Sequence, residues 1–280
     1  MATRVIAAAV GLPILLATVL LLPPLATAIV FAAACAVAAY EMLWRTGFLK
    51  HRRIVLYTAV MAAAVVLWSW MLACAVITPK FLWLSALLGL FVFFTALFCE
   101  LLSAHKELKF SSLCIAVFSG IVYPMMIGAL VRLRGMDGGQ YFILVAFLLS
   151  MVADSGAYFV GRAFGRHKLA PIISPKKTVE GVIGGVAANV AMMLLFTLLL
   201  SKAFGFAQVH YLYAVVYGVL GAGASTVGDL TLSVAKRQTG IKDYGNLIPG
   251  HGGILDRFDS TMLVAPLTEI LILLIPFAVK

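Results

Sequence analysis

Long apolar runs dominate this chain and restrict it to one class of structure. The sequence is 63% hydrophobic and only 11% charged, whereas soluble domains average roughly 45–50% apolar and about 25% charged residues. A run of about 20 apolar residues crosses a bilayer as a helix, because lipid offers the backbone no hydrogen-bond partner. We therefore predict an all-α fold, a polytopic integral membrane helical bundle.

The apolar runs predict about nine transmembrane helices. Their approximate bounds are Val5–Leu22, Leu25–Trp44, Ile54–Thr78, Phe81–Cys99, Ser111–Val131, Gly139–Gly161, Val179–Leu200, Val209–Leu230 and Ser260–Val279. No Pro/Ser-rich hinge or low-complexity tract divides the chain, so we expect a single membrane domain over residues 1–280. Within it, residues 1–135 would form the N-terminal helices, and residues 136–280 the catalytic helices and cytoplasmic loops.

The basic residues predict the orientation of this bundle. Most of the 21 Lys and Arg residues fall between the predicted spans on one side of the membrane. Because cytoplasmic loops are enriched in Lys and Arg, we expect this side to be cytoplasmic. The formal net charge of +10 also suits a surface that faces anionic headgroups or anionic substrates.

The C-terminal third places aspartates at membrane depth, where an ionisable side chain is costly unless it is paired or solvated. Asp229 closes the eighth predicted span, and helical spacing puts Ser233, Lys236 and Arg237 on the same stripe. Asp256 and Asp259 are three residues apart and share a helix face. A Gly/Pro-rich link, "GNLIPGHGG", separates the two groups and permits close turns. We expect the three carboxylates to converge.

Converging carboxylates repel one another unless a cation lies between them. Oxygen-only ligands favour Mg²⁺ or a similar hard ion over zinc. We therefore predict that Asp229, Asp256 and Asp259 bind Mg²⁺, as a site for one or two cations. The alternative is a structural ion network in which the same acids pair with Lys236, Arg237 and Arg257.

A second polar stretch, "GRAFGRHKLAPIISPKKTVEG", joins the sixth and seventh predicted spans. One interpretation is a solvated, positively charged cytoplasmic loop. The other is a phosphate site: Ser174 is expected to cap a helix with Pro175 in its first turn. The lysines 176 and 177 would then lie beside free backbone N–H groups, which bind phosphate well.

Three further features, two in the predicted spans and one in a loop, also suggest a role. Asp154 lies inside the sixth span, where it is either functional or a hydrogen-bonded helix contact. Gly181 and Gly185 form a GxxxG pair, which predicts close helix packing. His251, between the glycines of "PGHGG", is expected to contact substrate.

The stretch "SVAKRQTGIKDYGNLIPGHGGILDRFDS", residues 233–260, resembles the signature of the phosphatidate cytidylyltransferases, also called CDP-diacylglycerol synthases. The pattern of that family runs S-x-x-K-R-x4-K-D, then x-G, then P-G-H-G-G-x-x-D-R-x-D. The matching positions are Ser233, Lys236, Arg237, Lys242, Asp243, Pro249, His251, Gly252, Gly253, Asp256, Arg257 and Asp259. The "GDL" at Asp229 and the "SPKKTVEG" segment are also similar to that family.

The resemblance implies transfer of the cytidylyl group of CTP to phosphatidate, in a divalent-metal enzyme that works with membrane lipid as a homodimer. No nucleic-acid partner is expected. The location would be the bacterial inner (plasma) membrane, with the active site facing the cytoplasm. The candidate catalytic residues are Lys236, Arg237, Lys242, Asp243 and His251; the candidate substrate contacts are Ser174, Lys176, Lys177, Thr178, Ser233 and Arg257; and the candidate metal ligands are Asp229, Asp256 and Asp259.

Two other functions fit parts of the same pattern. A CTP-dependent lipid kinase would use similar polar loops, but its lipid alcohol must lose a proton, so an aspartate would act as a base. A proton- or cation-coupled transporter would use Asp154 and Asp229 as a relay within the membrane. The acids cluster in the C-terminal third and no inverted repeat is evident, which disfavours the transporter.

Overall fold

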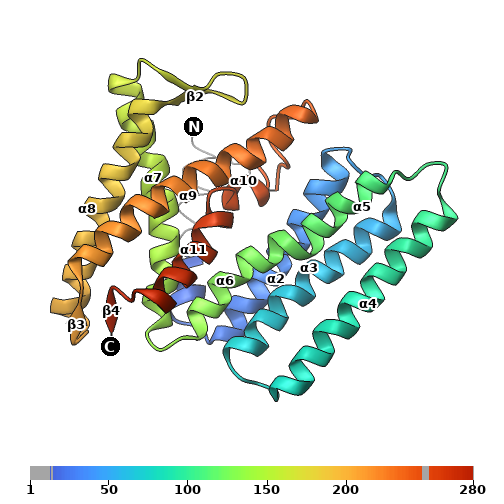
Figure 1. Ribbon diagram of the computed structural model, residues 1–280, viewed down its shortest axis with the longest axis horizontal. Coiled ribbons are helices and arrows are strands. Elements are labelled where there is room, and N and C mark those ends of the chain that lie inside the picture. The colour runs from blue at the N-terminus through green and yellow to red at the C-terminus, as the bar shows by residue number, and fades with distance from the viewer. Residues whose placement is uncertain (1–12, 14, 248–251, 280) are drawn as a thin grey trace. The chain divides into compact units, whose positions relative to one another are not determined.

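The computed structural model describes residue 13 and residues 15–247 and 252–279, and it is built almost entirely of helices (Figure 1). The helices are α2 (Pro24–Tyr40), α3 (Arg52–Ala73), α4 (Pro79–Ser103), α5 (Phe110–Val117), α6 (Tyr123–Gly135), α7 (Gly139–Phe164), α8 (Val179–Ala203), α9 (Tyr211–Gln238), α10 (Leu255–Phe258) and α11 (Thr261–Leu274). Two π-helical turns, η1 (Glu41–Arg45) and η2 (Phe118–Val122), extend α2 and join α5 to α6. The all-α prediction is confirmed.

Short antiparallel strand pairs lie at helix ends. Strand β1 (Lys168–Ala170) pairs with β2 (Ser174–Thr178), and β3 (Gln208–Val209) pairs with β4 (Ala278–Val279). The first pair forms the connection from α7 to α8, a hairpin where the sequence indicated either a loop or a helix start.

Seven helices in the described part of the chain are long and apolar enough to cross a membrane. They are Pro24–Arg45, Arg52–Ala73, Pro79–Ser103, Phe110–Gly135, Gly139–Phe164, Val179–Ala203 and Tyr211–Gln238. They confirm a polytopic membrane protein, and each overlaps a predicted span. The first predicted span, Val5–Leu22, lies mostly outside the described residues.

The last predicted span, Ser260–Val279, is shorter in the structure than the sequence indicated. Helix α11 has 14 residues and ends at Leu274. Pro276 follows two residues later, and the residue before a proline is disfavoured from helical geometry; Ile275 accordingly has φ −140° and ψ 68°, outside the helical region. The chain instead becomes extended and forms β4.

The chain divides into two compact units. The first comprises Met1–Met136 and Gln238–Arg257, and the second comprises Asp137–Arg237 and Phe258–Lys280. The segment after α9 therefore belongs with the N-terminal helices, although the sequence grouped it with the catalytic half. Whether the two units form the single domain expected from the sequence stays a prediction.

In the first unit, α3 packs against α2, α4 and α6. A hydrophobic cluster formed by α3, α4, α5 and the segment after α2 lies at its core, and its most buried members are Leu43, Ile54, Leu97 and Ala116. Apolar side chains on the outer face of α4, such as Phe81 and Leu87, are exposed, as expected for a helix that contacts lipid.

In the second unit, α7 and α8 pack with their backbones close together. A Cβ atom at Gly181 would lie 2.7 Å from the carbonyl oxygen of Ala157, and one at Gly185 would lie 2.8 Å from that of Ala153. Both distances are shorter than real Cβ contacts allow, so only glycine fits here. The prediction that this GxxxG pair serves helix packing is confirmed.

We predict that Gly185→Ala lowers the stability of the second unit. The new methyl group meets a backbone carbonyl that cannot rotate away, and overpacking of this kind costs about 1–3 kcal/mol. Gly223→Ala in α9 is the matched control, because its Cβ would meet nothing within 4 Å. Thermal unfolding of the detergent-solubilised protein should show a lower midpoint for Gly185→Ala alone, and equal midpoints would contradict this packing.

Candidate functional site

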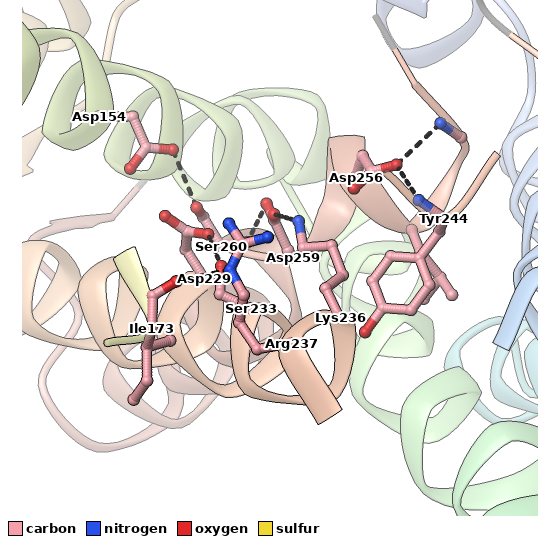
Figure 2. A network of polar contacts seen from close by, with 12 residues as sticks. Asp154, Ile173, Asp229, Ser233, Lys236, Arg237, Tyr244, Asp256, Asp259 and Ser260 are labelled. Carbon is pink, nitrogen blue, oxygen red and sulfur yellow. Dashed lines mark hydrogen bonds and ion pairs between the residues drawn. The ribbon is translucent and has the colours of Figure 1, made fainter. Parts of the chain in front are cut away.

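The polar end of α9 carries four of the predicted site residues, at positions 229, 233, 236 and 237 (Figure 2). Helical spacing brings Ser233 one turn after Asp229, and its Oγ donates a hydrogen bond of 3.1 Å to the Asp229 Oδ1 atom. The predicted shared stripe is therefore present.

The next turn of α9 reaches a different acid. Lys236 is buried, with 8% exposure, and its Nζ atom lies 3.8 Å from Oδ2 of Asp259. Asp259 follows α10, in the part of the chain that returns to the second unit. A second, independent stretch of sequence thus contributes a carboxylate to the end of α9.

The β1–β2 hairpin supplies another cation to the same group. The Nζ atom of Lys177 lies 2.5 Å from Oδ2 of Asp229. The Nε atom of Arg237 donates a hydrogen bond of 3.0 Å to the carbonyl oxygen of Ile173, which precedes β2. These two contacts fasten the hairpin to the end of α9 and hold Lys177 in the cluster.

Helix α7 contributes a third carboxylate, Asp154. Its Oδ2 accepts a hydrogen bond of 2.8 Å from Ser260 Oγ, and its Oδ1 accepts one of 3.4 Å from Ser225 Oγ. The backbone N–H of Ser260 also donates to Asp259 Oδ1, at 2.8 Å. Ser260 therefore bonds two of the three acids and fixes their spacing.

Close backbone packing sets the distance between α9 and the turn that carries Asp259. A Cβ atom at Gly228 would lie 2.6 Å from the carbonyl oxygen of Asp259 and 3.1 Å from that of Ser260. Glycine at this position lets the turn approach α9, which brings Asp259 beside Asp229.

The resulting cluster is rich in negative charge for a partly buried site. Asp229 and Asp154 interact electrostatically with Asp259. Burial, followed by the repulsion from Asp229, raises the pKa of Asp259 above the usual range of an aspartate, although Lys236 opposes the shift. The ionised cluster is thus under electrostatic strain that an added cation would relieve.

The donor chemistry of this cluster fits a hard divalent cation. No group of three or more His, Cys, Asp or Glu residues close enough to hold an ion occurs within the described part of the chain. Mg²⁺, however, is commonly bound by one or two carboxylates together with water and substrate phosphates. Asp229 and Asp259 provide two such carboxylates, and the remaining ligands would be water and substrate oxygens.

The third predicted metal ligand, Asp256, belongs to the first unit and accepts hydrogen bonds from backbone N–H groups. It is buried, and its Oδ2 accepts hydrogen bonds from the N–H groups of Tyr244 at 2.7 Å and Gly253 at 3.0 Å. These bonds tie together the two sides of the glycine-rich link. The role of Asp256 as a metal ligand stays a prediction.

The other predicted residues of this link are exposed or lie outside the described residues. Lys242, Asp243 and Arg257 are exposed to solvent. His251 and Pro249 lie outside the described residues.

The expected helix start at Ser174 is wrong. Residues 174–178 form strand β2, and α8 begins at Val179. The reason is pairing with another segment: residues 174–178 form an antiparallel ladder with β1, in which Ala170 faces Ser174 and Lys168 faces Thr178. Thr178 caps the helix instead, because its Oγ1 accepts a hydrogen bond of 3.1 Å from the N–H of Gly181.

The two lysines of this segment consequently lie on a strand and not at a helix start. Lys176 is exposed, whereas Lys177 is half-buried against Asp229. The alternation of a strand explains this difference, since successive side chains point to opposite faces. A role for Ser174, Lys176 and Thr178 in binding substrate stays a prediction.

Residues 2–275 match the cytidylyltransferase family. The chain belongs to that family. The match includes every described residue of the acidic cluster and of the glycine-rich link.

Individual relatives share part of the chain with this protein. A phosphatidate cytidylyltransferase of Staphylococcus saprophyticus is 44% identical over 135 residues, which is 48% of this chain and 50% of the relative. One of Staphylococcus epidermidis is 43% identical over 141 residues, and one of Haemophilus influenzae is 43% identical over 128. The matched stretch spans about half of each of these relatives, or 44% in the last case.

The structure brings into these networks three residues beyond the predicted ligands and substrate contacts. Asp154, for which the sequence leaves a functional and a structural role open, joins the acidic cluster, and Ser260, the predicted start of the last span, bonds two of its acids. Glu41 was not considered, although a lone buried acid in the helix "AAYEMLWR" was the available signal.

We predict that Thr178→Ala destabilises the start of α8. Loss of an N-cap oxygen costs about 1 kcal/mol, and the N–H of Gly181 would lose its side-chain partner. Thr178→Ser keeps the hydroxyl and is the matched control. The thermal unfolding midpoint of Thr178→Ser should lie near that of the wild type, and that of Thr178→Ala should lie below it. The same midpoint for both variants would exclude a capping role.

Proposed function

We propose that this protein transfers the cytidylyl group of CTP to phosphatidate, forming CDP-diacylglycerol and pyrophosphate. The observation that carries the proposal is the cluster at the end of α9, where Lys177 and Lys236 contact Asp229 and Asp259. Family membership and the printed name of the relatives, phosphatidate cytidylyltransferase, support it.

The transfer reaction requires neutralisation of phosphate charge more than it requires a general base. A phosphomonoester has a second pKa of about 6, so the phosphate of phosphatidate is largely ionised near neutral pH. One of its oxygens attacks the α-phosphorus of CTP, a new P–O bond forms, and the bond from the α-phosphorus to the bridging oxygen breaks. The electron pair leaves with pyrophosphate. The main barrier is the approach of two anions.

The residues of the second unit fit this need. Lys177, Lys236 and Arg237 bring positive charge to one end of α9, where they would offset phosphate charge and orient the nucleotide. Asp229 and Asp259 would hold Mg²⁺, with Ser233 keeping Asp229 in place. When bound, this ion supplies charge neutralisation on the phosphate oxygens.

The remaining candidate residues are included because they match the sequence signature of the family. They lie in the first unit, in the hairpin or outside the described residues, and they are Ser174, Lys176, Thr178, Lys242, Asp243, His251, Asp256 and Arg257. Their proposed role is contact with CTP, with the lipid phosphate or with the metal.

The membrane location suits these substrates. The acyl tails of phosphatidate would stay in the bilayer, while its headgroup meets a soluble nucleotide at the boundary. We propose that the protein acts as a homodimer in a bacterial inner membrane and that the site faces the cytoplasm. The one-sided distribution of Lys and Arg supports this orientation.

We predict that lipid receives label from CTP carrying radioactive phosphorus at the α position, and none from CTP labelled at the γ position. The cytidylyl group contains the α-phosphorus, whereas the γ-phosphorus leaves in pyrophosphate. Purified protein, phosphatidate vesicles and thin-layer separation of the lipids suffice for the measurement. Transfer of the γ label would instead identify a CTP-dependent lipid kinase.

We also predict that Mg²⁺ in the presence of CTP raises the thermal unfolding midpoint. Binding at about 100 times the dissociation constant adds about 2.7 kcal/mol of stability. Asp229→Asn should remove most of the metal-dependent part, because it takes away a proposed ligand. Asp137→Asn, an exposed acid of the same unit, should respond as wild type does, and an equal response from both variants would disprove the site.

A further inference from the structure

One buried acid of the first unit has no part in the function proposed above. Glu41 is only 3% exposed, and it begins the π-helical turn η1 at the end of α2. The turn is closed by a hydrogen bond of 3.3 Å from the N–H of Thr46 to the carbonyl oxygen of Glu41. Single π-turns inside helices occur frequently at functional sites.

The carboxylate of Glu41 binds the far end of the glycine-rich link. Its Oε1 accepts a hydrogen bond of 3.1 Å from the N–H of Ile254, and its Oε2 accepts one of 3.0 Å from the N–H of Leu255. Both oxygens are used, and the two donors belong to adjacent residues. A helix near the N-terminus therefore fixes backbone more than 200 residues later.

Two glycines of the link pack directly against this carboxylate. A Cβ atom added at Gly245 or at Gly253 would overlap the carboxylate atoms of Glu41. The link thus approaches Glu41 from both of its described sides, before and after residues 248–251. Asp256 reinforces the same closure, since it accepts N–H bonds from Tyr244 and Gly253.

We propose that Glu41 is a positioning residue for the catalytic link. Its carboxylate bonds the N–H groups of Ile254 and Leu255 and packs against Gly245, so it fixes the spacing of the two described sides of the link. This spacing sets the places of Lys242 and Asp243 before the link and of Arg257 after it. The inference rests on the proposed function, because it assigns these signature residues to the cytidylyl transfer.

The test compares two buried acids of the same unit. Glu41→Gln keeps the shape but leaves one acceptor oxygen for two N–H donors. Glu100→Gln is the matched control: Glu100 is also buried, and it contacts Arg53 at 3.4 Å and Tyr57 at 3.5 Å but not the link. Each variant is purified at full length, and its turnover and backbone amide exchange are measured.

For Glu41→Gln we expect turnover to fall by about 10-fold or more. Losses of this size are typical for residues that orient functional groups without contacting the substrate themselves. The amides of residues 244 and 253–255 should exchange faster, while those of α3 keep wild-type rates. Glu100→Gln should leave both the turnover and the exchange of the link unchanged. Wild-type turnover and exchange in Glu41→Gln would overturn the proposal, as would equal effects of the two substitutions.

A pair of further variants keeps the test decisive if Glu41→Gln does not fold. Gly253→Ala should impair turnover because its methyl group meets the Glu41 carboxylate, and Glu41→Asp, with its shorter side chain, should relieve part of this defect. The loss in Gly253→Ala/Glu41→Asp should therefore be smaller than the product of the single losses. Purely multiplicative losses would refute the contact. Absence of lipid product in the wild type would refute the proposed function instead, and the exchange measurement would still test the link.

Discussion

This structure depends on one constraint: each carboxylate buried in an apolar chain needs hydrogen-bond donors or cations around it. Each such group loses its water, so protein donors or cations must replace it. In the second unit the replacements are lysines for Asp229 and Asp259, and serine hydroxyls for Asp154. In the first unit, backbone N–H groups bond Glu41 and Asp256, whereas the side chains of Arg53 and Tyr57 contact Glu100. Side-chain and backbone donors thus both compensate buried acids.

The kind of donor decides how easily a buried acid can change partners. A lysine side chain can leave its carboxylate without movement of the backbone, and Lys177 and Asp229 are both partly exposed. Backbone N–H groups of a folded link move only if the link itself rearranges. Polar chemistry thus concentrates around α9, whereas Glu41 and Asp256 maintain the shape of the chain.

The sequence predicted the parts of the fold and site that depend on local pattern. Apolar run length gave the helices, and helical spacing placed Ser233 beside Asp229. Local pattern failed where distant segments decide the outcome. Strand β2 forms because it pairs with β1, and Glu41 is important only because residues 254 and 255 meet it. Nothing near Glu41 in the sequence specifies these partners.

Backbone donors at the end of the glycine-rich link are already occupied. Consecutive N–H groups in a glycine segment ordinarily form a concave nest that attracts phosphate. Here the N–H groups of Gly253, Ile254 and Leu255 already bind the protein's own acids. Because Glu41 and Asp256 already accept these N–H groups, the same donors are not available to a phosphate group from solution.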